Sequence, residues 1–192
     1  MSHHSDSHAR TVSADQGLSL CPVDAEGFLA LVDEFIGIYS AAMGYPAEQA
    51  SARRQLWEQH ALRAGFSCVA VFDRCGHPVA FAYGYSGRRG QWWNTEVARG
   101  VRGTPAEAWL ADYAELTELH VRPDHQGQGL GERTLRAFLA SRTEPQVLLS
   151  TPEGDNRAWR LYRRLGFQDV LRSYRFTGDG RPFGILGLVL PV

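Results

Sequence analysis

A glycine-rich turn between a strand and a helix is the feature that most constrains the fold of this chain. The apolar pattern predicts a strand ending at Val121-Arg122-Pro123 and a helix that begins within the run Gln126-Gly127-Gln128-Gly129-Leu130-Gly131. Glycines let other groups approach the backbone closely, and the N–H groups of the first helical turn have no intrahelical partner. The turn therefore predicts either an anion site suited to a phosphate or pyrophosphate, or simply the tight closure of a β-α unit. It is not the dinucleotide-binding fingerprint, because Glu132 stands where G-x-G-x-x-G requires a glycine.

The strand that leads into this turn has an irregular apolar pattern. Leu119 and Val121 share one face by two-residue alternation, whereas Leu116 has the opposite phase. The slip predicts a β-bulge, although burial on both sides of the strand would also explain the pattern. If a bulge separates this strand from a neighbour, the backbone groups of residues 119–121 become available to bind an extended ligand arm or an oxyanion.

Apolar periodicity over the rest of the chain predicts an α/β layer fold with a mixed sheet. The expected helices are residues 24–42, 47–63, 129–141 and 155–165, and the expected strands are residues 66–73, 79–85, 113–122, 146–150, 167–176 and 182–190. The long connection 86–112 contains Trp92, Trp93 and Trp109. It predicts a short amphipathic helix pinned by aromatic side chains, a wall over a substrate cleft, or both.

The composition excludes several classes of function. All 20 basic residues are arginine, which rules out Schiff-base and pyridoxal-phosphate chemistry and a lysine-containing phosphate-binding loop. The net charge of −1 argues against a nucleic-acid partner. No apolar run approaches the ~18–20 residues that a membrane span needs, so we expect no membrane association.

Three cysteines at no metal-like spacing predict a reduced, cytoplasmic protein without a metal centre. The polar residues 1–16 are expected to form a flexible N-terminus without a targeting signal, and residues 17–192 a single domain.

A third segment completes a recognisable set of motifs. It is the predicted helix with Ala158, Leu161 and Tyr162, followed by Leu165-Gly166-Phe167. With Val121-Arg122-Pro123, and with Gln126, Gly129 and Gly131 matching the pattern Q/R-x-x-G-x-G/A, the chain resembles the GCN5-related N-acetyltransferase (GNAT) superfamily. The strong part of the resemblance covers roughly Glu115 to Phe167.

The resemblance implies a fold and an activity. The fold would be the acyl-CoA N-acyltransferase fold, with a mixed, mostly antiparallel central sheet flanked by helices and a bulged strand near residues 115–121. The activity would be direct transfer of an acetyl group from acetyl-CoA to a primary amine of an unidentified acceptor, which we expect to be a small molecule, and a homodimer is possible. The alternatives are a non-catalytic acyl-CoA-binding sensor or scaffold, and an acetyltransferase that acts on protein amines.

The resemblance also assigns residues to acetyl-CoA. The cofactor-binding residues that it implies are Leu119, His120, Val121, Gln126, Gly127, Gln128, Gly129, Leu130, Gly131 and Asn156. The family commonly has asparagine seven residues before the motif tyrosine, but this chain has Asp155 there. Asn156 is then the candidate for the pantetheine contact, and Asp155 the expected helix N-cap.

The chemistry requires two proton transfers, and the resemblance suggests which residues perform them. Tyr162 occupies the position of the general acid that protonates the departing thiolate. For the base that takes the proton of the amine, Glu118 is preferred and Glu115 is the second choice, with His120 as another candidate. Simple ion pairing with arginines would explain either carboxylate equally well.

Overall fold

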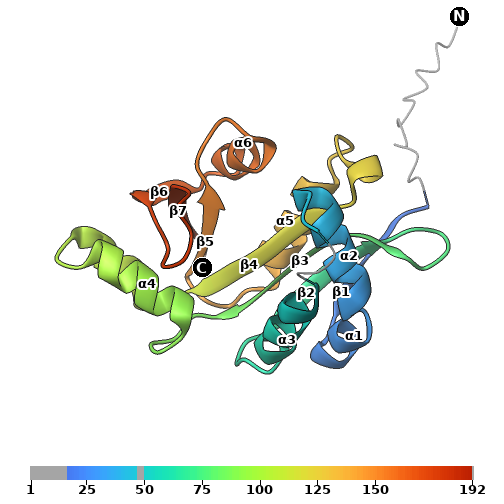
Figure 1. Ribbon diagram of the computed structural model, residues 1–192, viewed down its shortest axis with the longest axis horizontal. Coiled ribbons are helices and arrows are strands. Elements are labelled where there is room, and N and C mark those ends of the chain that lie inside the picture. The colour runs from blue at the N-terminus through green and yellow to red at the C-terminus, as the bar shows by residue number, and fades with distance from the viewer. Residues whose placement is uncertain (1–16, 47–49, 192) are drawn as a thin grey trace, which may run out of the picture.

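The computed structural model describes residues 17–46 and 50–191, which build one seven-stranded sheet with helices packed around it (Figure 1). The strands are β1 (Ser19–Val23), β2 (Ser67–Phe72), β3 (Pro78–Ser86), β4 (Ala114–Val121), β5 (Gln146–Pro152), β6 (Gln168–Tyr174) and β7 (Phe183–Val189). Their order is β1-β2-β3-β4-β5-β7-β6, with β4 and β5 parallel and every other neighbouring pair antiparallel. The predicted mixed, mostly antiparallel sheet is confirmed, whereas the expected flexible segment 1–16 lies outside the described residues.

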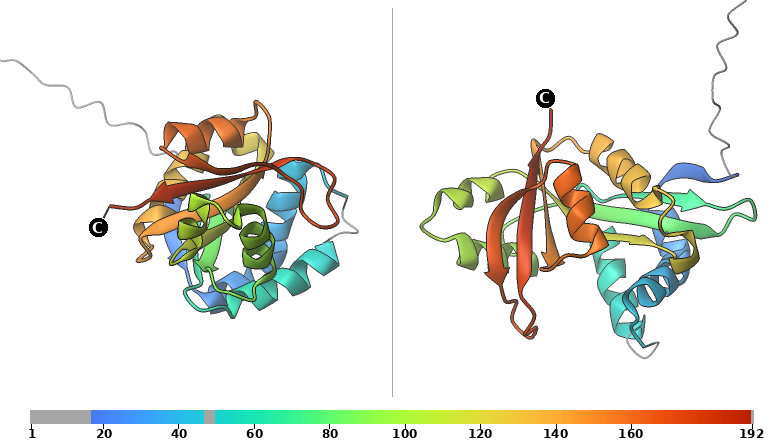
Figure 2. Two further views of the ribbon diagram at one scale, coloured as in Figure 1. Left: turned by 90° about the vertical axis from the view of Figure 1, so that its left-hand side faces the viewer. Right: turned by 90° about the horizontal axis from the view of Figure 1, so that it is seen from above.

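Helices cover both faces of the sheet. They are α1 (Ala25–Ala30), α2 (Val32–Met43), α3 (Ala50–Ala61), α4 (Trp92–Val101), α5 (Leu130–Ala140) and α6 (Arg157–Arg164), with short 3-10 turns η2 (Pro105–Leu110) and η3 (Pro123–His125). Figure 2 shows α1–α3 on one face and α5 on the other. The first face buries an aromatic cluster that includes Phe28, Phe35 and Trp57, and the second an aliphatic cluster around Leu135.

The first strand and the first helix differ from the prediction. β1 was not predicted, because Pro22 disfavours a strand, but β1 is an edge strand, where proline is tolerated. The expected helix 24–42 is two helices, α1 and α2, which are separated at Leu31 by a non-helical backbone conformation (φ −102°, ψ 6°). Both helices still direct their apolar residues against β2 and β3.

The connection that follows β3 is mostly helical. The expected short helix pinned by aromatic side chains is therefore present. The indole of Trp93 on α4 donates a hydrogen bond to Ser150 Oγ on β5 (3.1 Å). Glu96 on α4 accepts hydrogen bonds from Thr177 N (3.0 Å) and Tyr174 Oη (3.3 Å). The other expectation, a wall over a substrate cleft, stays a prediction.

The predicted β-bulge is present in β4. Opposite β3, Glu118 pairs with Tyr83 and Leu116 with Gly84, so Thr117 is the extra residue. A Cβ at Gly84 would lie 2.0 Å from the carbonyl oxygen of Glu115, so only glycine allows the strands to approach this closely. The bulge gives Glu118 the same face of the sheet as Glu115, because in the described pairing both lie opposite tyrosines of β3 that share one face.

β4 and β5 separate just before the bulge. Their parallel pairing consists of Ala114 with Val147 and Glu115 with Leu148. Among the described residues, no strand pairs with the β5-facing side of β4 after Glu115. This unpaired side of β4 ends at Val121, and the chain then passes through η3 (Pro123–His125) and the glycine-rich turn to the start of α5.

Candidate active site

The glycine-rich turn has the backbone conformation of an anion-binding loop. Gly127 and Gly129 both have positive φ (+80° and +78°), which side-chain-bearing residues rarely adopt. Gly129 is the N-cap of α5, and the carbonyl of Gly129 accepts the first helical bond, from Arg133 N (3.0 Å). Within the described chain, no acceptor is recorded for the N–H groups of Gly127, Gln128 and Gly129. These N–H groups are the kind that hold a phosphate at a helix N-terminus, and phosphate binding by this turn stays a prediction.

Gln126 connects this turn to two other elements. Its Nε2 donates to the carbonyl of Val121 at the end of β4 (3.0 Å), and its Oε1 accepts from Arg157 at the start of α6 (3.0 Å). The Val121 carbonyl, which we expected to be free for a ligand arm, is therefore already hydrogen-bonded. Gln126 fixes the turn relative to the opening between β4 and β5.

Tyr162 is held by the end of its own helix. Gly166 has a φ of +89° and ends α6, which lets Phe167 N donate to the carbonyl of Tyr162 (3.1 Å). The rings of Tyr162 and Phe167 pack with their centroids 5.5 Å apart. Tyr162 is only 7% exposed, and burial, with a further contribution from the charge of Glu118, raises its pKa. The phenol stays protonated at neutral pH, as a general acid must.

Glu118 is part of a closed group of four side chains. One carboxylate oxygen lies 3.6 Å from Arg53 on α3, and the other is hydrogen-bonded to His120 Nε2 (2.7 Å). Arg53 also donates to the hydroxyl of Tyr39 on α2 (2.5 Å) and stacks over its ring, and that ring meets the His120 ring edge-on. Burial, the largest effect, together with the charge of Glu118 raises the pKa of Tyr39 to about 12. The carboxylate of Glu118 therefore has a fixed position and two partners.

Glu115 lies deeper on the same face and has fewer partners. It is 4% exposed, and its Oε1 accepts a hydrogen bond from Tyr85 Oη (3.0 Å). Its Oε2 is buried without a partner among the described residues. Burial raises the pKa of this carboxyl to about 7, against the lowering effects of the Tyr85 bond and of Arg63. A carboxyl with a pKa near 7 can take up and release a proton under physiological conditions.

The N-cap of α6 is Asn156, so the expectation that Asp155 caps this helix is wrong. Asn156 Oδ1 accepts from Trp159 N (2.8 Å), and its Nδ2 donates to the Pro152 carbonyl (3.2 Å). Asp155 lies outside the helix and forms an exposed ion pair with Arg160. The pantetheine contact expected of Asn156 stays a prediction, and this amide would make it while also capping the helix.

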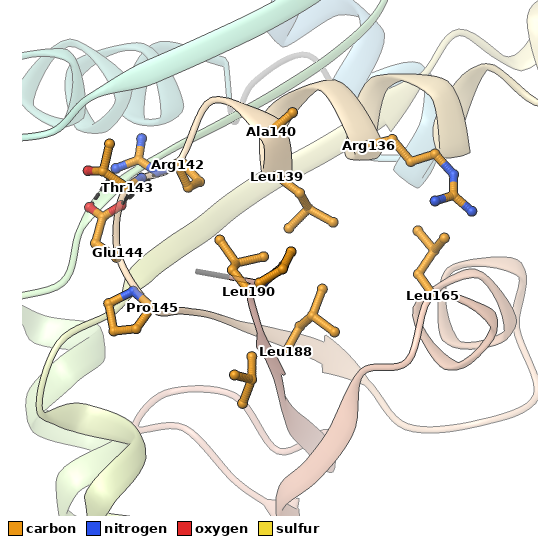
Figure 3. A pocket seen from close by; sticks show the side chains of 12 residues that line it. Arg136, Leu139, Ala140, Arg142, Thr143, Glu144, Pro145, Leu165, Leu188 and Leu190 are labelled. Atoms are coloured by element: carbon orange, nitrogen blue, oxygen red, sulfur yellow. Dashed lines mark hydrogen bonds and ion pairs between the residues drawn. The ribbon is translucent and has the colours of Figure 1, made fainter.

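A separate hollow of about 570 Å³ lies between the end of α5 and the end of β7 (Figure 3). Apolar side chains line much of it, among them Leu139, Leu165, Leu188 and Leu190. None of the predicted site residues borders this hollow. The candidate active site is instead the separation of β4 from β5, which the glycine-rich turn follows along the chain. Both glutamates lie on β4, and the charge of Glu118 acts on Tyr162 of α6.

Two further findings concern metal binding and membrane-spanning helices. In residues 17–46 and 50–191, no group of three or more histidine, cysteine, aspartate or glutamate side chains is arranged to hold a metal ion. None of the helices in the described part of the chain has the length and apolarity to cross a membrane.

The bulged strand, its separation from β5 and the glycine-rich turn match the class of protein that the sequence resemblance implies, an acyl-CoA-dependent acyltransferase. Residues 32–167 match the acetyltransferase (GNAT) family. The chain belongs to this family and is an N-acetyltransferase. It is 42% identical to the GCN5-like protein acetyltransferase Rv2170 of Mycobacterium tuberculosis, over 91% of this chain and 98% of that relative.

Solved structures show the same fold at lower identity. The ribosomal-protein-S18-alanine N-acetyltransferase of Escherichia coli is 18% identical, with a TM-score of 0.61 and coverage of 91% of this chain and 95% of that one. The putative acetyltransferase yncA of Salmonella typhimurium, solved with its cofactor acetyl-CoA, is 17% identical, with a TM-score of 0.59 and the same coverage.

Proposed function

We propose that this protein transfers the acetyl group of acetyl-CoA directly to a primary amine. The observation that carries the proposal is the separation of β4 from β5, which is followed along the chain by the glycine-rich turn and by the helix that bears the buried Tyr162. The backbone N–H groups of Gly127–Leu130 would hold the pyrophosphate, and the free side of β4 would lie beside the pantetheine arm. The cradle fits this group, because a Cβ added at Gly127 or Gly129 would meet no neighbouring atom.

In the proposed reaction the amine nitrogen attacks the thioester carbonyl, and the carbon–sulfur bond breaks. The amine loses a proton to a carboxylate of β4, and the thiolate gains one from the Tyr162 hydroxyl. An alkylamine has a pKa near ~10 and a thiol one near ~8.5, so both transfers need a positioned partner at neutral pH. The burial of Tyr162 and its raised pKa support its role as the donor.

The partners of the two glutamates favour Glu115 as the proton acceptor, although the sequence favoured Glu118. Glu115 has an oxygen without a partner among the described residues and a pKa of about 7. Both oxygens of Glu118 are engaged, by Arg53 and by His120. In this assignment Glu118 keeps the Tyr162 phenol protonated through its charge and orients His120.

We propose that the acceptor is a protein amine rather than the small molecule that the sequence suggested. The support is the relative that is 42% identical over nearly its full length, which is described as a protein acetyltransferase. The cytoplasmic location and the homodimer expected from the sequence stay predictions.

The proposal is tested by acetyl-CoA turnover with a panel of amines, measured as release of free thiol. The panel contains peptides whose only amine is one lysine, peptides whose only amine is the N-terminus, polyamines and free amino acids. We expect amine-dependent thiol release, with the peptides as the best acceptors. Binding of acetyl-CoA without turnover of any amine would contradict the catalytic proposal, and turnover of small amines alone would contradict the protein acceptor.

A further inference from the structure

Arg53 brings a positive charge to the acceptor side of the candidate active site. It lies 3.6 Å from Glu118, which shares a strand and a face of the sheet with Glu115, the proposed proton acceptor. Sequence periodicity does not point to Arg53, because this residue reaches β4 only through the packing of α3.

The guanidinium of Arg53 has donors to spare. Its Nη1 faces Glu118 and its Nη2 donates to the Tyr39 hydroxyl, whereas a guanidinium carries five N–H donors. The side chain is 30% exposed, compared with 13% for Glu118. Arg53 is thus held in place by two contacts and still presents N–H groups that match a carboxylate.

A second arginine contacts Tyr45, which packs against Tyr39; these two tyrosines are called the tyrosine row below. Arg181, in the connection between β6 and β7, donates to the Tyr45 hydroxyl (3.2 Å) and is paired with Asp179 (2.6 Å). The Tyr45 ring packs against the Tyr39 ring, with centroids 5.5 Å apart. The hydrogen bond from Arg181 to Tyr45 therefore joins the β6–β7 hairpin to the segment that follows α2.

The charges around the tyrosine row do not suit a cationic acceptor. Glu118 is matched by Arg53, and Asp179 by Arg181, while the charge of Arg63 acts on the remaining carboxylate, Glu115. A site for a polyamine needs carboxylates in excess of its arginines, and like charges brought together are strongly unfavourable. An amine with a carboxylate close to it would instead engage the remaining N–H groups of Arg53 while the amine faces the glutamates of β4.

We infer that the acceptor site selects amines in acidic surroundings, such as a lysine flanked by aspartate or glutamate, and that Arg53 is the residue that determines this preference. The inference rests on the proposed transfer to a protein amine. It concerns which acceptor is chosen, and it does not require Arg53 to take part in the chemistry.

The experiment uses three blocked peptides, Ala-X-Lys-X-Ala, in which X is aspartate, asparagine or arginine, so that lysine is the only amine. For the wild-type protein we expect kcat/KM to fall in the order aspartate, asparagine, arginine. The aspartate and arginine peptides should differ by about tenfold or more, which is the size of effect that a charge-assisted hydrogen bond provides. We expect the Arg53→Gln variant to lose most of this difference.

The matched control is Arg54→Gln, which removes the same charge one residue further along α3. Arg54 is paired with Asp33 and Glu58 on the outer surface, so its loss should leave the order of the peptides unchanged. Retention of the order in Arg53→Gln, or a wild-type preference for the arginine peptide, would overturn the inference. If Arg53→Gln does not bind acetyl-CoA, the wild-type protein alone provides the test. Its kcat/KM should then fall from the aspartate to the arginine peptide, and this difference should become smaller at high salt.

Failure of the proposed function can be told apart from failure of this inference. If the proposed function is wrong, acetyl-CoA binds to the wild-type protein but none of the three peptides is acetylated. Turnover of all three peptides at equal rates contradicts the inference alone.

Discussion

Glu115 and Glu118 lie on one strand and one face, yet their surroundings give them different properties. Glu115 is buried beside a single hydrogen-bond donor, and its pKa is raised to about 7. Glu118 is held between Arg53 and His120. A buried carboxyl without a cationic partner favours the neutral form, so it can act as a base that releases its proton again.

Replacement of Glu115 by glutamine should slow acetyl transfer by about 10²–10⁴-fold, the range expected for loss of a general base. The wild-type protein should lose activity as the pH falls below about 7, because Glu115 must be ionised to accept the proton. The measurement is kcat/KM against pH for the wild type and the variant, which should lack this acidic limb. Glu118→Gln is the comparison, and loss of the limb in that variant with its retention in Glu115→Gln would show that Glu118 is the base.

Glu115→Gln should also change how the free energy of unfolding depends on pH, which can be measured without an activity assay. A carboxyl whose pKa is raised in the folded state contributes stability that is present at low pH and is lost as the pH rises through about 7. Chemical unfolding of Glu115→Gln should therefore lack this decline, since glutamine can still accept the Tyr85 hydrogen bond. Equal pH dependence of the two proteins would mean that Glu115 does not titrate in this range.

At the scale of single residues, the sequence identified the candidate site residues but not their partners. Tyr162, Glu115 and Glu118 were predicted from their motifs. Their differing environments depend on Arg53 and Tyr85, which come from other elements, and sequence periodicity carries no information on those contacts. The N-cap of α6 was misplaced by one residue because Asp155 and Asn156 both favour that position.

The glycine-rich turn and the start of α5 act as one element that presents unpaired N–H groups. Gly129 caps the helix in the left-handed conformation, and a Cβ added to it would meet no atom within 4 Å. Both features suit the close approach of a negatively charged group to the end of the helix.

Gly129→Asp should abolish binding of acetyl-CoA, because a carboxylate would lie against its phosphates and a side chain would strain the positive φ. Gly129→Ala is the matched control, since it introduces the strain without the charge, and we expect it to weaken binding only partly. Calorimetric titration with acetyl-CoA measures both. If Gly129→Asp binds acetyl-CoA as well as Gly129→Ala does, the phosphates do not bind at this turn.

At the scale of elements, periodicity predicted where most helices and strands lie but not every break between them, since the expected helix 24–42 is divided at Leu31. The helix that became α5 and the bulge in β4 were both predicted from the apolar pattern. β1 was missed because its strand character comes from pairing with β2 rather than from propensity. The long connection was ambiguous because a helix pinned by tryptophans and a wall over a cleft require the same residues.

The molecule as a whole consists of two parts of a sheet that meet at a short parallel pairing. β1–β4, with α1–α3, form one part, and β5–β7, with α6, form the other. The aliphatic cluster under α5 packs against residues of both, such as Leu116 and Leu186. This arrangement leaves the β5-facing side of β4 without a strand partner after Glu115 among the described residues.

The overall topology was predictable because three motifs occur in a fixed order along the chain. The position of the acceptor was not, since it depends on how α2, α3 and the β6–β7 hairpin pack together. The absence of lysine, which first served only to exclude mechanisms, has a practical use here. Any acetyl-lysine formed in an assay must come from the added acceptor.

The most direct test of the account is to compare kcat for acetyl transfer with the Kd for acetyl-CoA in the wild type and in Tyr162→Phe. We predict that the variant binds acetyl-CoA with nearly unchanged affinity and that its kcat falls by about 10²–10⁴-fold, because only the proton for the departing thiolate is lost. An unchanged kcat in Tyr162→Phe would contradict the account.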